Sequence, residues 1–174
     1  IRAGISSGDN AAFLRLWHEI DITKSKIYSA EYMYTPHNKG GEYRKWYGNR
    51  EYMLRYNSSA INEMEQCAGF RHDGREYYFK PHVTWSKITS YKSSFRFFEE
   101  GFTFDSAGLG LFPVESESYY TTMALMNSVV VEKLIGLLNP TLNVTPIVVK
   151  QLPYLETRES TERIAKDCVS LSRF

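Results

Sequence analysis

The spacing of apolar and polar residues predicts a chain of short helices and strands. Apolar positions recur at helical spacing over Ala11–Ile20, behind a candidate N-cap at Asp9 or Asn10. Apolar and polar residues alternate over Lys26–Tyr34, which predicts a strand. Helix- and strand-breaking residues over Pro36–Gly41 then predict a turn region.

The middle of the chain is predicted to be rich in strands. Glu51–Tyr56 reads as a strand, Ser58–Cys67 as a short helix with Ile61 and Met64 facing inward, and Asp73-Gly74 as a turn. Four further short strands are expected, at Val83–Ile88, Phe95–Phe98, Phe102–Phe104 and Leu109–Phe112.

The last third of the chain changes character, beginning with the continuous apolar run Tyr119–Met126. Three elements are expected after it: a helix over Val129–Leu138 capped by Asn127-Ser128, a buried strand over Val144–Leu152 and a closing helix over Ser160–Ser172. The sum is an α+β fold, with a strand-rich aromatic middle and short flanking helices. We expect residues 1–174 to form a single domain.

Charge is segregated along the chain. Hydrophobic residues make up 43% of the 174 residues, enough for a packed core, and the formal net charge is only +1. Yet Lys39–Arg96 carries eleven Lys and Arg against six Asp and Glu, whereas residues 99–174 carry six against ten. The basic middle could form a surface that meets a polyanion, or it could be an ordinary solvated surface. No apolar window reaches the length of a membrane span, so no membrane partner is expected.

The aromatic residues coincide with the basic middle. Of the 26 aromatic residues, 19 lie between Tyr28 and Phe104, often beside basic residues, as in Tyr43-Arg44-Lys45-Trp46-Tyr47. Aromatic rings can stack on bases while neighbouring cations hold phosphates. The alternative is that they fill the pleated surfaces of strands. We expect most of them to be core and a minority to face a ligand.

The sequence contains no complete catalytic constellation. The four histidines lack metal-ligand spacing, Cys67 and Cys168 form no CxxC pair, and Ala107–Gly110 is a short glycine pair that is expected to be a turn. Asn139-Pro140-Thr141 lacks the second proline and the aromatic residue of the tetrapeptide that holds a flipped adenine in amino-methyltransferases. We therefore expect no catalytic, cofactor or metal residues in this chain.

Several segments together carry a resemblance. Residues 38–49 read N-K-G-G-E-Y-R-K-W-Y-G-N, and residues 4–17 contain G-I-S-S-G-D-N followed by F-L-R-L-W. Supporting matches are Thr84–Ile88, Phe104–Gly108, Leu125–Ser128 and Leu138–Asn143. These motifs resemble the C-terminal target-recognition region of BREX-type (PglX-like) adenine-specific DNA methyltransferases, with type IIG restriction–methylation enzymes as cousins. The first motif departs from that family at Ser7, where threonine is usual.

The resemblance implies that the chain is a fragment of a site-specific adenine-N6 DNA methyltransferase from a bacterial restriction-modification or phage-defence system. The catalytic domain and its S-adenosylmethionine site would then lie upstream of Ile1. Methylating an adenine requires extruding it from the duplex, so a second region besides the catalytic domain must bind the DNA. The implied partners are double-stranded DNA, the upstream methyltransferase domain and other defence-system proteins, in the bacterial cytoplasm.

The candidate DNA-binding residues come from the resembling motifs and the basic middle: Ser7, Asn10, Lys39, Arg44, Lys45, Tyr47, Asn49, Arg50 and Lys87. Structural roles remain open for some of them, because Ser7 and Asn10 could organise a helix entry, and Trp46 and Tyr47 could be core residues. Gly40, Gly41 and Gly48 could simply permit positive φ. Two other functions also remain open, a carbohydrate-binding module and a protein-interaction domain without DNA binding.

Overall fold

The strands of the computed structural model, which describes residues 1–21, 23, 33–88, 92–114, 118–139, 141–155 and 159–173, form three sheets. A four-stranded sheet has the order β2 (Leu14–Leu16), β4 (Tyr52–Arg55), β3 (Tyr34–Asn38) and β8 (Thr103–Phe104). Its β3–β8 pair is parallel and its other pairs are antiparallel. Segments far apart in the sequence therefore meet at β3, the strand that leads into residues 39–51.

The second sheet is antiparallel and lies at the centre of the molecule. Its order is β7 (Phe95–Phe98), β6 (His82–Ser86) and β9 (Gly108–Leu111). Every residue of β6 and β7 is buried, as expected for strands covered on both faces. The third sheet is a small pair formed by β1 (Ile5–Ser6) and β5 (Arg71–His72).

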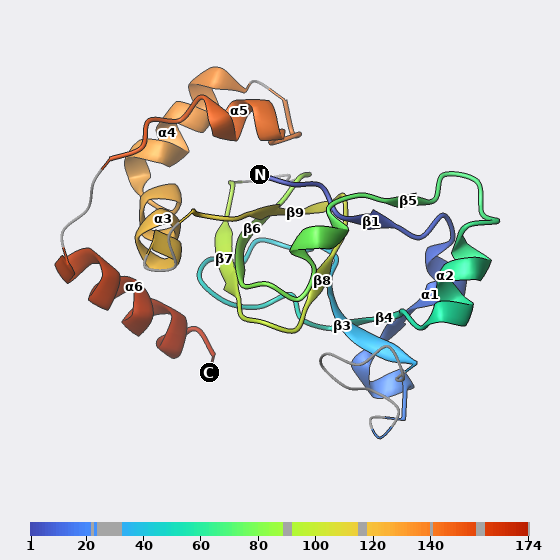
Figure 1. The fold of residues 1–174 in the computed structure, drawn as a ribbon. Helices are drawn as coiled ribbons and strands as arrows, with labels where there is room; N and C mark the ends of the chain where they lie inside the picture. The colour runs from blue at the N-terminus through green and yellow to red at the C-terminus, as the bar shows by residue number, and fades with distance from the viewer. Residues whose placement is uncertain are drawn as a thin grey trace.

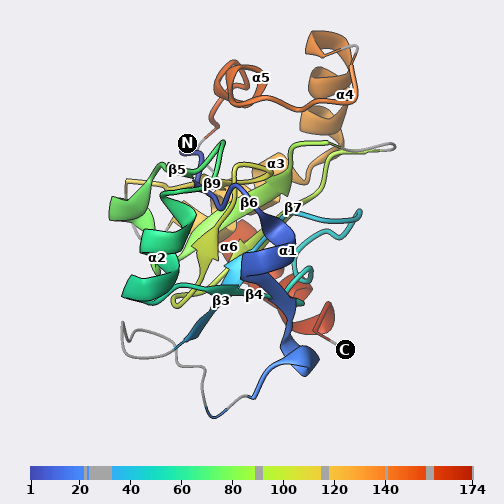
Figure 2. The ribbon, with the colours of Figure 1, turned by 90° about the vertical axis from the view of Figure 1, so that its right-hand side faces the viewer.

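Helices flank the sheets at two ends of the molecule (Figure 1). The described α-helices are α1 (Asn10–Phe13), α2 (Ser58–Met64), α3 (Ser118–Met126), α4 (Val129–Leu138), α5 (Pro146–Lys150) and α6 (Glu159–Leu171). α3 packs on β6, β7 and α6. Figure 2 shows α4 and α5 projecting beyond the sheets.

Two hydrophobic clusters form the core. The larger joins the central sheet to the C-terminal helices through Trp85 and Phe95 on one side and Met123 and Val131 on the other. The smaller cluster is centred on Leu54, Ala60, Met64 and Phe104, all fully buried. Because strands and helices both contribute, the expected α+β class is confirmed.

Many of the elements expected from the sequence are confirmed. The strands match those predicted around residues 51–56, 83–88, 95–98, 102–104 and 109–112, with shifts of one or two residues. α2, α4 and α6 also occur where they were expected. Ser128 caps α4 by accepting a hydrogen bond from the Val131 amide at 3.2 Å, and Gly74 has a φ of 65° at the predicted turn.

The helix predicted over Ala11–Ile20 is wrong beyond its first turn. α1 begins after the N-cap Asp9 but ends at Phe13, and the next residues form β2, paired with β4. Leu14 is buried in this pairing, whereas Trp17, expected on the same apolar face, is 56% exposed. Tertiary strand pairing therefore overrides the helical spacing.

Three other predictions fail at short elements. Val144–Leu152 is not a strand, because Pro146 begins helix α5, a position that suits its fixed φ. Pro36 lies inside β3, where β8 runs beside only the last two residues and leaves one edge open at the proline. Ala107–Gly110 is not a turn, since Gly108 opens strand β9. Most of the strand predicted over Lys26–Tyr34 lies outside the described residues.

No single helix in the described part of the chain is long and apolar enough to cross a membrane. The pair α3–α4 would meet the length and composition test together, but it is bent by 62° at its break.

Candidate nucleic-acid interface

The candidate site is built on residues 39–51, the segment between β3 and β4, called here the signature loop. Trp46 anchors it to the edge of the central sheet, since the Trp46 amide donates to the Phe95 carbonyl at 2.9 Å. The Phe97 amide in turn donates to the Trp46 carbonyl at 3.0 Å. Trp46 has a φ of 74°, an unusual value for a residue with a side chain. The sheet therefore holds the middle of the loop in a fixed position.

A buried amide fixes the start of the loop. Asn38, at the end of β3, is fully buried, and its Nδ2 donates to Thr84 Oγ1 at 2.9 Å and to the Gly108 carbonyl at 3.2 Å. Its Oδ1 accepts from the Gly40 amide at 3.1 Å. This single side chain links β3, β6, β9 and the loop, so the first residue of the signature is structural.

Lys39 enters a second buried network. Its Nζ donates to Asp105 Oδ2 at 2.5 Å, and the Ala107 amide donates to Asp105 Oδ1 at 2.7 Å. Burial alone would raise the pKa of Asp105, but the hydrogen bond from Lys39 and the nearby His37 ring, whose Nε2 lies 3.7 Å from Asp105 Oδ2, hold it well below its usual value. Burial lowers the pKa of His37, so Lys39 is the cation that balances this carboxylate at neutral pH.

Arg50 is also engaged by the protein. Its guanidinium makes a bidentate pair with Glu99 at 2.6 and 2.5 Å and donates to the Phe97 carbonyl at 2.8 Å. It stacks on the ring of Tyr47, with 4.0 Å between Cζ and the ring centroid. The hydrogen bonds from Arg50 lower the pKa of Glu99 against the opposing effect of burial. Arg50 therefore ties the loop to the end of β7.

Lys45 points toward the C-terminal helices. Its Nζ donates to the Asn127 carbonyl at 3.1 Å and lies 3.8 Å from Glu132. Asn127 in turn pairs its side-chain amide with the backbone of Phe95 at 2.9 and 2.8 Å. The contact joins the loop, the central sheet and the start of α4.

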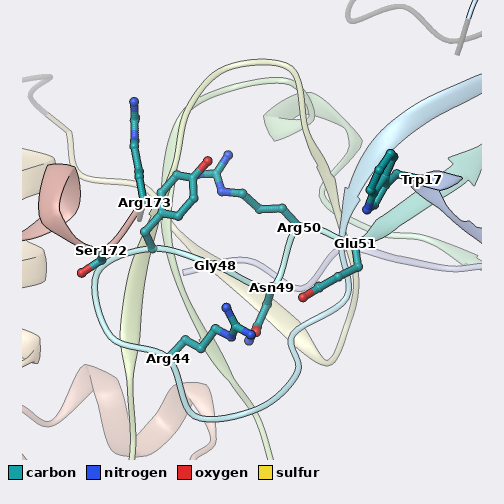
Figure 3. Close-up of a pocket in the computed structure, with 9 residues that line it drawn as sticks. Trp17, Arg44, Gly48, Asn49, Arg50, Glu51, Ser172 and Arg173 are labelled. Carbon is teal, nitrogen blue, oxygen red and sulfur yellow. The ribbon is translucent and has the colours of Figure 1, made fainter.

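Arg44, Tyr47, Asn49 and Arg50 line one open cavity of about 350 Å³. Other lining residues come from the loop exit, η1 (Trp17–Glu19) and the end of α6: Glu51, Trp17, Ser172 and Arg173. Figure 3 shows the side chains of Arg44 and Glu51 directed toward Asn49. Asn49 has a φ of 57° and is locked by a 2.9 Å hydrogen bond from its Nδ2 to the Glu42 carbonyl.

A buried guanidinium lies near this cavity. Arg96, in β7, is fully buried, and its Nη2 donates to Ser86 Oγ at 2.8 Å. Its Nε and Nη1 have no hydrogen-bond partner among the described residues. Burial lowers the pKa of Arg96 to about 10, while the Glu51 carboxylate raises it and Arg44 lowers it. Arg96 therefore stays charged at neutral pH, within electrostatic range of two cavity residues.

The remaining predicted residues do not line the cavity. Ser7 is buried and donates to Asn10 Oδ1 at 3.0 Å beside the start of α1, as a helix-entry role would require. Lys87 is exposed at the end of β6, and its amide donates to the Ala107 carbonyl at 3.0 Å. Sequence reasoning missed Glu51, Trp17, Arg96 and Arg173 as neighbours of the site. For Glu51 a signal existed, because it follows the signature directly.

The glycine pair of β9 does not form an open cofactor loop. The glycine pair of β9 is packed against protein, since a Cβ on Gly108 would lie 2.7 Å from Asn38 Oδ1 and from the Gly40 amide nitrogen. The strand therefore leaves no space for a cofactor at these glycines. Within the described ranges, no group of three His, Cys, Asp or Glu residues could hold a metal ion.

Comparison with known proteins places the chain in a family. No protein-family model matches it. It is 31% identical over 171 residues to the adenine-specific methyltransferase BrxX of Escherichia coli O9:H4 (strain HS), a match that covers 97% of this chain and 14% of that protein. It is also 31% identical over 155 residues to the adenine-specific methyltransferase PglX of Lacticaseibacillus casei (strain Zhang), covering 82% of this chain and 13% of that protein.

These matches first define a class, because both relatives are large adenine-specific methyltransferases of which the chain spans only a small part. More particularly, the chain corresponds to a small region of the BREX-type adenine-specific methyltransferases. The family resemblance inferred from the signature is confirmed.

Proposed function

We propose that this chain is a DNA-recognition region of a BREX-type adenine-N6 DNA methyltransferase in the bacterial cytoplasm. The observation that carries the proposal is the cavity on the signature loop, which is lined by Arg44, Arg173 and the exposed Trp17. Arginines and exposed aromatic rings are the side chains that bind phosphates and bases. The match to methyltransferases supports DNA as the substrate class.

In this proposal the chain grips and reads DNA, while the chemistry belongs to other parts of the enzyme. S-adenosylmethionine would supply the methyl group there, since both relatives are named adenine-specific methyltransferases and the chain spans only a small part of each. Lys87 and Arg44 would contact DNA, because both side chains are exposed. Lys39, Lys45 and Arg50 would position the loop through their protein partners.

The test is DNA affinity of the intact methyltransferase as a function of salt. Replacing Arg44, Lys87 and Arg173 together by Gln should weaken binding and reduce the slope of log K against log salt by about 2–3. The matched control replaces three exposed cations of the C-terminal helices, Lys133, Lys150 and Arg163, by Gln. Equal losses in both triple variants, or salt-insensitive binding, would reject this face as the DNA contact.

Cofactor affinity provides a second readout. The Arg44, Lys87 and Arg173 variant should bind S-adenosylmethionine like the unmodified enzyme, because these residues lie outside the proposed cofactor site. Calorimetry measures this directly. A matching loss of cofactor affinity would indicate that the substitutions damage the whole enzyme rather than its DNA contact.

A second candidate function is protein docking through α4 and α5. Leu137 and Ile147 on these helices are 81% and 70% exposed, and Leu138 and Leu142 are exposed as well. Exposed apolar side chains grouped on projecting helices are typical of protein contacts. If the rest of the methyltransferase covers them, Leu137→Glu with Ile147→Glu should increase amide hydrogen exchange in α4 and α5 of the intact enzyme. Unchanged exchange would reject this contact.

A further inference from the structure

Five of the six charged residues of the signature loop, all except the exposed Glu42, fall into two groups. Lys39, Lys45 and Arg50 each have a hydrogen-bonded partner in the protein. The side chains of Arg44 and Glu51 make no hydrogen bond or ion pair with any residue in the described ranges, although both line the cavity. An arginine and a carboxylate left unused in the same cavity are available to a ligand.

The two side chains are well positioned to act together. Glu51 directly precedes β4 and its carbonyl accepts from the Trp17 amide at 2.8 Å, so its backbone is fixed. The Arg44 amide donates to Ser94 Oγ at 3.2 Å, which fixes the other residue to the central sheet. Between them, Asn49 is buried and hydrogen-bonded to the Glu42 carbonyl. Figure 3 shows both charged side chains directed toward it.

A buried cation lies near Glu51. The buried guanidinium of Arg96 lies within electrostatic range of Glu51 and lacks a carboxylate partner among the described residues. The oxygens of the Glu51 carboxylate accept hydrogen bonds only. The cavity therefore presents the hydrogen-bond donors of the Arg44 guanidinium together with the acceptor oxygens of the Glu51 carboxylate.

This combination suits a base edge better than a phosphate. A phosphate would pair with Arg44 but would be repelled by Glu51. In the major groove, arginine pairs with O6 and N7 of guanine, and a carboxylate accepts from N4 of cytosine. A single G·C pair presents these groups side by side.

We propose that Arg44 and Glu51 read one G·C pair of the recognition site, Arg44 donating to guanine O6 and N7 and Glu51 accepting from cytosine N4. The assignment rests on the proposed function, since it requires this face to contact DNA. Glu51 is thereby a specificity-determining residue that acts beside Arg44. Trp17, which is 56% exposed, lines the same cavity and would border the contact with the base pair.

The experiment measures methylation by the intact enzyme on oligonucleotides in which each base pair of its site is replaced in turn. Arg44→Gln and Glu51→Gln should both reduce discrimination at the same G·C pair, by about 5- to 150-fold. Discrimination at the other positions should be retained. Glu42→Gln and Arg163→Gln are matched controls, because both residues are exposed and neither lines the cavity.

Three outcomes would overturn the proposal. Tighter binding of all sequences by Glu51→Gln identifies a phosphate cavity instead. Full discrimination with a lower melting temperature in Glu51→Gln makes Glu51 only a counter-ion for Arg96. Relaxation at two different base pairs means that the residues do not act on one pair. Loss of DNA binding is a separate matter: if the unmodified enzyme fails to bind DNA through this face in the salt experiment, the proposed function fails as well.

Discussion

The buried network beneath the signature loop and the cavity on its surface each contain a basic and an acidic residue, but only those of the buried network pair with each other. Beneath the loop, Lys39 and Asp105 satisfy each other at 2.5 Å, and Asn38 bonds to two strands. On the surface, Arg44 and Glu51 line a cavity, and neither side chain pairs with another residue that the structure describes. A basic residue in a family signature is therefore evidence of a ligand contact only after its protein partners have been identified.

The largest expected effect is a loss of stability, and it tests the buried network around Lys39 and Asp105. Asp105→Ala removes the carboxylate that balances Lys39 and accepts from the Ala107 amide. Breaking such a pair leaves a poorly solvated cation, so the free energy of unfolding should fall by about 3–5 kcal/mol. Urea denaturation measures it. Asp167→Ala, at an exposed position of α6, is the control and should change stability by less than about 0.5 kcal/mol.

Acidification should also destabilise the protein, through its buried histidines. Burial lowers the pKa of His82 to about 4, against an unfolded value near 6.5. Because the folded pKa is depressed, the unfolded state binds the proton more readily, and His82 contributes stability above pH 6.5 that is lost toward pH 4. The loss should reach about 3 kcal/mol over that range. His37, whose pKa is also lowered, acts in the same direction.

The stability of His82→Gln as a function of pH tests this origin. Its dependence between pH 6.5 and 4 should be shallower than that of the unmodified protein. His18→Gln, at an exposed position, should leave the dependence unchanged. Asp105, with its strongly depressed pKa, adds a further loss that begins only below about pH 4. Parallel profiles for all three proteins would remove His82 as the cause.

Arg50 should show an intermediate effect, because its partner Glu99 is half exposed. Arg50→Ala removes the bidentate pair and the stacking on Tyr47, and should lower stability by about 1–2 kcal/mol. Thermal unfolding would show a fall of several degrees. Arg71→Ala breaks an ion pair in which both side chains are more than half exposed, and should cost less than about 0.5 kcal/mol.

The smallest effect on stability is expected at Arg44. Its side chain is exposed and has no ion pair with a described residue, so Arg44→Ala should change the free energy of unfolding by less than about 0.5 kcal/mol. The same variant should lose DNA affinity. If Arg44→Ala destabilises the protein as much as Arg50→Ala does, the distinction between a cation that is paired within the protein and one that is not would be wrong.

The sequence predicted the strand-rich middle well because local signals there agree. Aromatic and β-branched residues over 83–88 and 95–98 are bounded by breakers, and the resulting strands are buried on both faces. It failed where partners distant in sequence decide the conformation. Leu14–Leu16 became a strand through pairing with Tyr52–Leu54, and the short apolar run 144–152 had no period that separates strand from helix.

For the site, the signature located the loop but not the roles of its residues. Arg50 pairs with a residue 49 positions away and Lys39 with one 66 positions away, so no local pattern shows that these cations are engaged. The sequence left open that the glycines of the signature simply permit positive φ. The structure is consistent with this role, since Gly40, Gly41 and Gly48 all have positive φ. Arg96 lay in an expected strand as one of several basic residues, and only the fold shows that it is buried.

The two backbone hydrogen bonds of Trp46 have a consequence for the evolution of the region. They clamp the chain ahead of Gly48–Glu51, and β4 clamps it immediately afterwards. The backbone on both sides of the cavity is therefore fixed, and the side chains of Arg44 and Glu51 can be changed without rebuilding the sheets around them. A library randomised at Arg44 and Glu51, with Lys39, Trp46, Asn49 and Arg50 retained, would therefore test directly whether these two positions determine the target site of the enzyme.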